Sequence, residues 1–441
     1  MTWLQRIEIR LATISLCVTA ATPPTVSSIL EMTGSARGSR ADETLLALPY
    51  DMLEQNEGAR ALPTLLAVIF VNLVGFGIVV PLLPFYAQSF HAPAWQMALI
   101  FSAYAMGAFF GEPFWGRMSD RIGRKPILIS TVCGNCLCYL ALAFAPNIYV
   151  AFIVRLIGGM ASGNASVIQG YIADVTPEHK RTGRMSYLSA AYNLGFIVGP
   201  ALGGLLAHPA AGHDGFRIPL IVASSLAGIC ALGIILFVKE SRAHPHHEFD
   251  DGPARWAVLG RAITHPVIAR LMAVTFLAGS AFMGIEFVFG LWSAARFNWG
   301  PREVGLAFAV VGIVAAFCQI FLTGRLSERF GEGRVLAAGM FLTAVAIGLQ
   351  PFAHGIGVVV LLGISALGQS VAWPNVSSLI SRHAEAEHQG QYQGLNNATG
   401  ALARLTGPLA SGFVFTTFSV NAPFYLAGLL VLPAIFFALA E

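Results

Sequence analysis

The segment "GRMSDRIGRKP" at residues 116–126 decides the expected fold, because nearly the same phrase returns as "GRLSERFGEGR" at residues 324–334. Five of the eleven residues in the first segment are charged, whereas 11% of the whole chain is charged. A second pair of segments, "GPALGG" at 199–204 and "GPLASG" at 407–412, is separated by the same 208 positions. Two repeats with one offset indicate two halves built to a common plan.

Long apolar segments surround these motifs. The 441 residues are 56% hydrophobic, and the charged share is less than half of the roughly 25% found in soluble domains. Such a composition excludes a soluble globule of this size. A helix of about 20 apolar residues crosses a bilayer. We predict twelve such spans, at 63–88, 96–116, 126–145, 148–174, 185–207, 217–238, 268–293, 302–324, 334–353, 356–380, 393–418 and 422–440.

Lys and Arg are unevenly distributed among the loops between these spans. Fifteen of them lie in alternate loops, at 116–126, 175–184, 239–265, 324–334 and 381–392. The other loops hold three, Arg217, Arg296 and Arg302. Because basic residues stay on the cytoplasmic side of a membrane, we expect a protein of the inner cell membrane whose helical body has both ends in the cytoplasm. Topology accounts for the basic bias without nucleic-acid binding.

The chain is therefore predicted to be an all-α membrane protein with two pseudo-symmetric six-helix bundles. The expected parts are, in order, an N-terminal extension, a first bundle, a cytoplasmic linker and a second bundle, at 1–61, 62–238, 239–265 and 266–441. The extension is interpreted as disordered, or as the product of a start codon placed too early. The linker contains His244, His246 and His247, which we interpret as solvated linker residues. No metal is predicted.

Two six-span repeats are the plan of many secondary transporters, in which the halves rock around a substrate held between them. The charged segment is then the turn between spans 2 and 3, where Gly116 and Gly123 give the backbone freedom to turn. Asp120 can pair with the neighbouring cations, or with a helix N-terminus, and so latch one state. The alternative is a turn that only anchors topology, which leaves Asp120 and the repeat unexplained.

These motifs resemble the major facilitator superfamily, and within it the twelve-span drug:proton antiporters, from about residue 62 to the end. The loop signature of the superfamily matches six residues, Gly116, Asp120, Arg121, Gly123, Arg124 and Lys125. Its second-half copy keeps Gly324, Arg325 and Arg329 and has Glu328 in place of aspartate. The antiporter motif, which separates exporters from symporters in this family, matches Gly195, Gly199, Pro200, Gly203 and Gly204, with Gly407 and Pro408 as the second-half counterpart.

Two further segments carry the resemblance. Arg155, followed by glycines at 159 and 163, is similar to the family motif whose arginine is implicated in proton coupling. Residues 72–84, "NLVGFGIVVPLLP", resemble the first-span signature of drug exporters. Tetracycline exporters carry an acid where this chain has Asn72, so the resemblance does not extend to tetracycline itself.

The spacing of these residues has a physical meaning of its own. Gly195, Gly199 and Gly203 recur every four residues and form one stripe along a helix. Such a stripe lets two membrane helices approach closely. Arg155 shares a stripe with its two glycines, and a buried arginine requires a partner inside the bundle.

Ionisable residues inside the spans are few and are functional candidates by default. They are Glu112, Arg155, Glu286 and Arg404. Glu112 is either functional or a partner of the loop cations, and Arg404 is expected to pair locally or with the first-half loop. Glu286 is the deepest acid of the second half and the preferred candidate for proton coupling or cation binding. It lies at a depth comparable to that of Arg155, so the two could meet between the halves.

The sequence contains no phosphate-binding G-x-x-x-x-G-K-[ST] motif, so nothing points to ATP. We predict a monomeric exporter of a small amphipathic or hydrophobic compound, driven by a proton gradient and without a cofactor. The first alternative is an importer or symporter of a polar solute such as a sugar, which the glycine-proline motif disfavours. A membrane-embedded receptor or enzyme is disfavoured because no metal cluster, nucleophile motif or soluble domain is recognisable.

Overall fold

The computed structural model describes residues 41–176, 178–241, 260, 264–384 and 389–439. The linker residues His244, His246 and His247 and the first 40 residues of the predicted extension lie outside this part of the chain. The chain forms two units, Met1–Glu57 and Gly58–Glu441. Every functional candidate belongs to the second unit.

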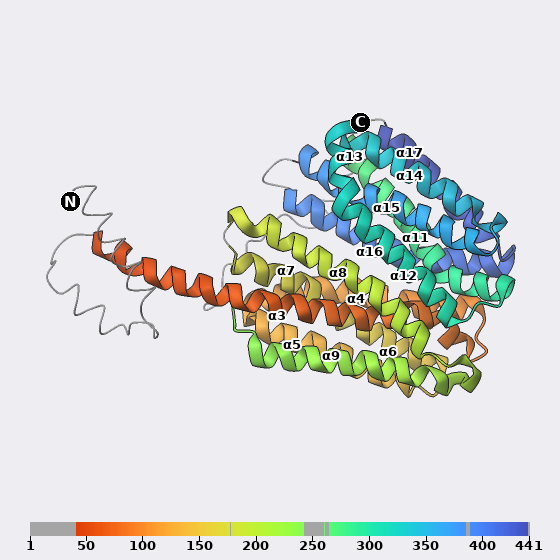
Figure 1. Ribbon diagram of the computed structural model, residues 1–441, viewed down its shortest axis with the longest axis horizontal. Coiled ribbons are helices and arrows are strands. Elements are labelled where there is room, and N and C mark those ends of the chain that lie inside the picture. The colour runs from red at the N-terminus through yellow and green to blue at the C-terminus, as the bar shows by residue number, and fades with distance from the viewer. Residues whose placement is uncertain (1–40, 177, 242–259, 261–263, 385–388, 440–441) are drawn as a thin grey trace. The chain divides into compact units, whose positions relative to one another are not determined.

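Helices follow one another along the whole described chain, and Figure 1 shows those of the second unit running side by side. The first half contains α3 (Ala41–Gln88), α4 (Ala94–Ile122), α5 (Arg124–Ala143), α6 (Ile148–Met160), α7 (Asn164–Asp174), α8 (Glu178–Leu206) and α9 (Arg217–Phe237). The second half contains α11 (Pro266–Phe297), α12 (Pro301–Phe317), α13 (Thr323–Phe330), α14 (Glu332–Leu349), α15 (Ile356–His383), α16 (Gln389–Thr417) and α17 (Ala422–Leu439). The described residues contain no strand, and each of the twelve predicted spans coincides with helix. The predicted all-α fold is confirmed.

Three helices differ from the predicted spans. The helix α3 begins at Ala41, about twenty residues before the predicted first span, although its membrane-length apolar part is Leu65–Gln88. Good helix formers such as Leu, Glu and Ala dominate the added segment, which accounts for its helical conformation. The eighth span contains a π-helical turn, Cys318–Leu322, between α12 and α13. The fourth span is broken into α6 and α7.

The break in the fourth span has a local cause. Gly163, the residue before α7, faces Trp115 of α4 so closely that a Cβ on it would lie 2.5 Å from the Cβ of Trp115. The indole Nε1 of Trp115 donates a 2.7 Å hydrogen bond to the carbonyl oxygen of Met160, which the break leaves without a helical partner. The prediction that Arg155, Gly159 and Gly163 form one stripe along a helix is therefore wrong for Gly163, because α6 ends at Met160.

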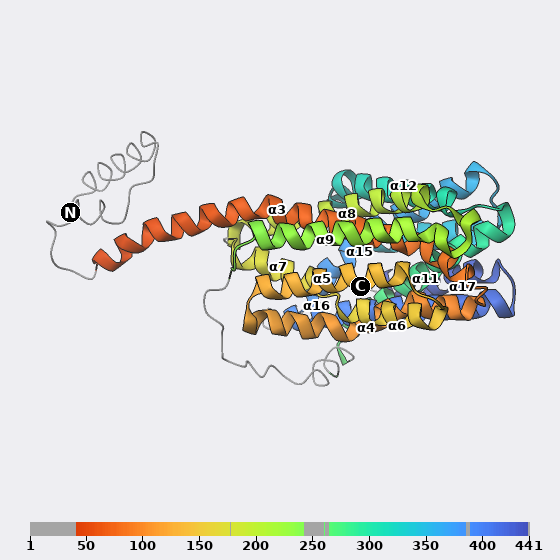
Figure 2. The same ribbon diagram turned by 90° about the horizontal axis from the view of Figure 1, so that it is seen from below.

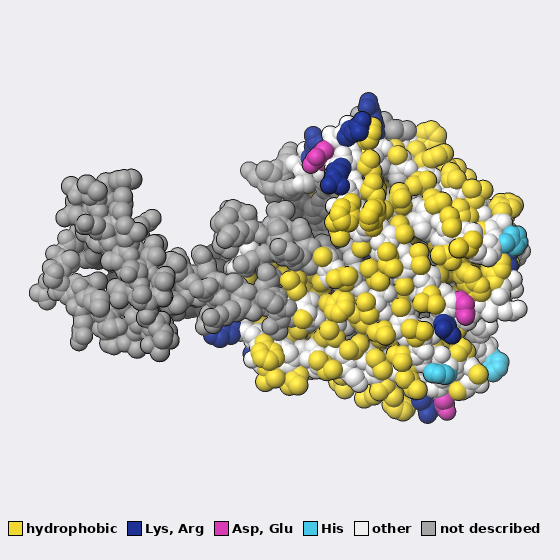
Figure 3. Space-filling view, viewed as in Figure 1, with side chains coloured by type: hydrophobic (Ala, Val, Ile, Leu, Met, Phe, Trp, Pro, Cys, Tyr) yellow, Lys and Arg dark blue, Asp and Glu magenta, His cyan; other side chains and the backbone are white. Residues whose placement is uncertain are grey.

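The surface of the helical unit is apolar over much of its area. Figure 3 shows hydrophobic side chains covering most of the visible face, with Lys and Arg gathered toward its edges. Several large apolar side chains in the middle of helices are more than half exposed, among them Phe110, Leu137, Ile229 and Leu429. Eight helices of the described chain are long and apolar enough to cross a membrane, and three shorter apolar helices accompany them. This surface matches hydrocarbon, not water.

Small residues bring helices together inside each half. In Figure 2, α5 lies beside α9 and α4 lies beside α6, and close contacts accompany both pairs. A Cβ on Gly159 of α6 would collide with the carbonyl oxygen of Tyr104 in α4. In the second half, Gly339 of α14 and Gly368 of α15 lie equally close, since a Cβ on either would lie 2.5 Å from the other's carbonyl oxygen. Such contacts make each half a tightly packed body.

The two halves meet through α8 against α12 and through α4 against α16. A Cβ on Gly204, near the end of α8, would lie 2.5 Å from the carbonyl oxygen of Pro301, which begins α12. In the other pair, the hydroxyl of Ser102 donates a 2.9 Å hydrogen bond to the carbonyl oxygen of Leu405. The second and fifth spans of each half thus form the interface between the halves, as expected for a duplicated chain.

Candidate functional site

The turn between α4 and α5 is the first candidate site, and Gly123 makes it possible. This glycine lies between the last residue of α4 and the first of α5 with a φ of 110°, a region that favours glycine. A Cβ on Gly123 would also lie 2.5 Å from Oε2 of Glu240. The position therefore requires glycine for its backbone angle and for the close approach of a carboxylate.

Glu240, three residues after the end of α9, closes the N-terminus of α5. Its Oε1 accepts the backbone N–H of Arg124 at 2.8 Å, and its Oε2 accepts that of Lys125 at 3.0 Å. These N–H groups have no partner within the helix, and a negative charge is favourable at this positive helix end. The ammonium of Lys125 in turn donates to the carbonyl oxygen of Ile235 in α9 at 3.0 Å. The segment after the sixth span is thus bound to the turn.

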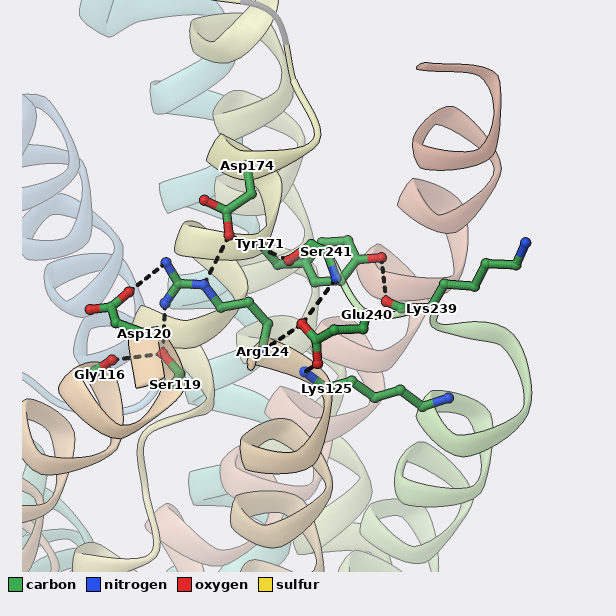
Figure 4. Close-up of polar contacts among 10 residues, drawn as sticks. All are labelled: Gly116, Ser119, Asp120, Arg124, Lys125, Tyr171, Asp174, Lys239, Glu240 and Ser241. Carbon is green, nitrogen blue, oxygen red and sulfur yellow. Dashed lines mark hydrogen bonds and ion pairs between the residues drawn. The ribbon is translucent and has the colours of Figure 1, made fainter. Parts of the chain in front are cut away.

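The guanidinium of Arg124 is the centre of the same network (Figure 4). It forms ion pairs with Asp120 at 2.9 Å and with Asp174, the last residue of α7, at 3.0 Å, and it donates to the hydroxyl of Ser119 at 2.6 Å. Arg124 is 7% exposed, so these contacts replace water around a buried charge. Three segments, namely the turn, the end of α7 and the segment after α9, are joined here.

The remaining residues of the loop signature lie around this centre. The carbonyl oxygen of Gly116 accepts the hydroxyl of Ser119 at 2.7 Å. Arg121 is exposed at the end of α4. Asp120 contacts a neighbouring cation, which is one of the two expected arrangements, and the helix N-terminus is occupied by Glu240 instead. The role of Asp120 as a latch stays a prediction.

The second-half turn repeats the backbone of the first. Gly331 lies between α13 and α14 with a φ of 85°. Arg325 donates to the carbonyl oxygen of Phe321 at 2.9 Å, and Arg329 lies 5.4 Å from the ring centre of Phe330. Gly324 and Glu328 are exposed on α13.

The glycine stripe of the antiporter motif packs α8 against α3, inside the first half. Each of the three glycines lies too close to α3 to leave room for a Cβ. A Cβ on Gly199 would lie 2.7 Å from the Cα of Gly77, and one on Gly195 would lie 2.7 Å from the Cβ of Leu73. A Cβ on Gly203 would lie 2.6 Å from the carbonyl oxygen of Ile78. Gly204 faces α12, and so does the carbonyl oxygen of Pro200, which a Cβ on Gly305 would meet, whereas the ring of Pro200 lies against Gly77 of α3. The motif therefore joins α8 to its own half and to the other half.

The second-half counterpart is built in the same way. A Cβ on Gly407 of α16 would collide with the carbonyl oxygen of Ser280 in α11. Pro408 is buried beside it. The repeated "GP" segments thus mark equivalent close contacts between the first and fifth helical positions of each half.

Arg155 lies inside the first half with an aromatic partner. Its side chain is buried, and its guanidinium carbon lies 4.6 Å from the ring centre of Tyr104 in α4. Its Nε has no hydrogen-bond partner within the described chain. The expected interior position is found, but the partner is a ring, in an arrangement that desolvation strengthens. No ion pair between Arg155 and Glu286 occurs among the described residues.

Glu286 lies in the middle of α11 on the face that turns toward the first half. Gly290, four residues later and hence on the same face, lies so close to α3 that a Cβ on it would be 3.3 Å from the ring of Phe85. The next residue, Phe287, packs at 5.5 Å against Phe101 of α4. Glu286 remains partly exposed, and its carboxylate has no hydrogen bond or ion pair within the described part of the chain. It is an acid between the halves that is available to a proton or a cation.

Glu112 and Asn72 complete the predicted set. Glu112 of α4 and Arg404 of α16 act electrostatically on one another across the interface of the halves. Arg404 thus approaches the first half through Glu112. Asn72 lies in α3 with its side-chain oxygen buried and, in the described chain, without a hydrogen-bond partner.

Sequence reasoning missed three residues that complete these sites, namely Tyr104, Asp174 and Glu240. Asp174 is the last residue of a predicted span, and Glu240 lies two residues after another, beside Lys239; at such places a charged group is ordinary and carries no distinctive signal. Tyr104 looks like any other aromatic residue of a membrane helix. Only the packing of α6 on α4 shows that it faces Arg155.

Comparison with known proteins adds a family assignment to this geometry. The sequence pattern of the Major Facilitator Superfamily matches residues 65–318 and 288–440. The chain is 32% identical to the "Tetracycline resistance protein, class C" of Escherichia coli over 365 residues, which cover 79% of this chain and 88% of that protein. It is 27% identical to "Multidrug resistance protein 2" of Bacillus subtilis (strain 168) over 383 residues, covering 86% and 94%.

A solved structure supports the fold. The human organic anion transporter MFSD10 superposes on this chain with a TM-score of 0.65 and 23% sequence identity, over 86% of this chain and 99% of that one. At this identity the likeness concerns the fold alone.

Proposed function

The chain belongs to the Major Facilitator Superfamily, and from this premise we propose that it is a secondary transporter that exports a small amphipathic or hydrophobic compound by alternating access. It is a multi-pass membrane transporter and not an enzyme. The two halves, tightly packed internally, move relative to each other around a substrate held between them.

One observation carries the proposal of export. The likeness to the tetracycline resistance protein extends over 79% of this chain at 32% identity, so it includes both halves and their interface. The likeness to the multidrug resistance protein covers the same region. The substrate class proposed here is a drug-like amphipathic molecule, with tetracycline disfavoured because Asn72 replaces an acid.

Inward proton flow is the proposed energy source. Glu286 supports it, because a partly exposed acid between the halves, without a partner in the described chain, is free to bind and release a proton during the cycle. Arg155 supports it less directly, since its Nε is unsatisfied and its positive charge lies among Tyr104, Tyr139 and Cys138. No cofactor is proposed.

The proposed location is the inner membrane of a bacterial cell, with the basic turns in the cytoplasm and the protein as a monomer. The basic residues of the turns before α5 and α14 support this orientation. Import of a polar solute such as a sugar is the alternative, and it predicts uptake of a labelled sugar instead of loss of a dye.

The test is an accumulation assay in intact cells. Cells that produce the protein are expected to retain less of a lipophilic fluorescent dye than cells that produce an export-inactive variant. A protonophore is expected to abolish the difference. Equal dye retention across a panel of dyes and drugs, with a sugar taken up instead, would contradict export. Export that persists with the protonophore would contradict proton coupling alone.

A further inference from the structure

The second half contains an ion pair that occupies the positions of the Arg124–Asp174 pair with the charges exchanged. Arg124 lies 208 positions before Glu332, and Asp174 lies 208 positions before Arg382, which is the offset of the two halves. The Nη1 atom of Arg382 lies 3.5 Å from Oε2 of Glu332. Glu332 thus stands where the first half has the basic residue Arg124, and Arg382 of α15 stands where the first half has the acidic residue Asp174.

The backbone around the two pairs is equivalent. Arg124 is the first residue of α5 and Glu332 is the first residue of α14, each directly after a glycine with a positive φ. Their partners lie at corresponding places, Asp174 at the end of α7 and Arg382 at the end of α15. Each pair therefore fastens the turn before the third span of its half to the end of the fourth span.

The neighbouring residues have changed together with the charges. A Cβ on Gly170 would lie 2.5 Å from the guanidinium carbon of Arg124, so the large cation requires glycine there. The corresponding residue of the second half is Ser378, whose hydroxyl donates a 2.8 Å hydrogen bond to Oε1 of Glu332. A smaller carboxylate leaves room for a side chain, and it accepts what that side chain donates.

The exchange also has an electrostatic reason at the helix N-terminus. A cation at the first residue of a helix is unfavourable, whereas an anion there is favourable. In the first half Arg124 stands there, and Glu240 supplies the negative charge from outside the helix. In the second half Glu332 supplies it from the first residue of α14 itself, so the pair to α15 must be completed by a cation.

We propose that Glu332 and Arg382 are positioning residues of the second half, a charge-exchanged counterpart of Arg124 and Asp174. They hold the turn between α13 and α14 against α15, so that this end of the half moves as one body. The effect on transport rests on the proposed export function, whereas the effect on the turn does not.

The test compares three variants, Glu332→Arg, Arg382→Glu and the double exchange, in the full-length protein. Each single variant places like charges together and is expected to speed hydrogen exchange at the amides of residues 331–334. It is also expected to lower transport turnover about fivefold at unchanged KM and membrane abundance. The double variant also carries Ser378→Gly, because a large cation at position 332 requires a glycine at the place that corresponds to Gly170. It is expected to recover most of both losses, with a remainder due to a cation at the start of α14.

Arg334→Gln is the matched control, because it removes an exposed cation from the same turn without an ion pair among the described residues. It is expected to leave amide exchange and turnover unchanged. A double variant as defective as the worse single variant overturns the pairing. Restored amide exchange with turnover unchanged in all variants overturns the role in transport. A wild-type protein that exports none of the probes, with the amide exchange still restored, contradicts the export function while the pairing stands.

Discussion

The carboxylate of Glu240 accepts the backbone N–H of Arg124 at 2.8 Å, so the segment after the sixth span caps the third. The same carboxylate accepts the N–H of Lys125 at 3.0 Å. A carboxylate in this position satisfies two amide groups that α5 itself cannot satisfy. The first half is thereby closed at the turn by the segment that follows its last span.

Glu240→Ala is expected to loosen the start of α5. The two N–H groups lose their acceptor, at a cost typical of a lost helix cap, about 1 kcal/mol. Hydrogen exchange of the amides at Arg124 and Lys125 should rise several-fold in the purified protein. Glu240→Gln, which keeps one acceptor oxygen, should show a smaller rise. Unchanged exchange at both amides in Glu240→Ala would mean that water replaces the carboxylate at no cost.

Asp120→Asn is expected to lower turnover far more than it changes KM. Asp120, at the end of α4, holds one edge of the Arg124 guanidinium at 2.9 Å. The substitution keeps the shape and removes the charge, so it acts on the switching movement and leaves substrate contacts alone. Transport kinetics at equal membrane abundance give the measurement. A normal rate would reduce the turn to a topology anchor.

Gly199→Leu is expected to abolish export while the protein still inserts into the membrane. Even Gly199→Ala should impair it, since its Cβ would lie 2.7 Å from the Cα of Gly77. Overpacking of this kind costs typically about 1–3 kcal/mol. The matched control is Gly348→Ala, in another membrane helix, where a Cβ meets nothing within 4 Å. Normal export by a well-expressed Gly199→Leu variant would place the stripe in a looser contact than the structure has.

Deletion of residues 1–51 is expected to leave membrane insertion and export intact. The apolar, membrane-length part of α3 begins at Leu65, well inside the truncated chain. Membrane fractionation and the dye assay check both properties, with the full-length chain as the control. A truncated protein found in the soluble fraction would show that the extension directs insertion.

Helix occurs at each of the twelve predicted spans, and apolar length specifies most of them, since eight helices of the described chain are long and apolar enough to cross a membrane and three shorter apolar helices accompany them. The break at Gly163 could not be predicted, because a glycine in a packing stripe and a glycine at a helix end look alike in sequence. The broken end is stabilised by Trp115, which lies in α4, about 50 residues earlier in the chain. The interior position of Arg155 could likewise be predicted, but not the direction of its side chain around the helix axis. Its partner is consequently Tyr104 and not Glu286.

The second-half turn shows the same limit. In the sequence, Glu332 appears only as the loss of a basic residue from a degenerate copy of the motif. Its partner Arg382 lies fifty residues away, in a different helix. The offset of 208 positions relates Glu332 and Arg382 to Arg124 and Asp174, but the sequence does not show that either pair is in contact. The packing of α14 against α15 shows it for the second half.

Glu286→Gln is the variant that tests coupling most directly. The amide keeps the shape and the hydrogen-bonding capacity of the acid but cannot ionise, and no described ion pair is broken by the change. The protein is therefore expected to fold and insert normally.

Because Glu286 lies on the α11 face that meets α3 and α4, it changes its surroundings whenever the halves rock. In the proposed cycle the protonated acid releases substrate outside and the deprotonated acid accepts it inside. Glu286→Gln should then lose proton-driven export, and any remaining substrate binding should no longer depend on pH. Binding and export measured at several pH values, with Glu112→Gln in parallel, give the comparison. Export at the normal rate that still responds to pH would remove Glu286 from the mechanism and move the role to Glu112 or Asp120.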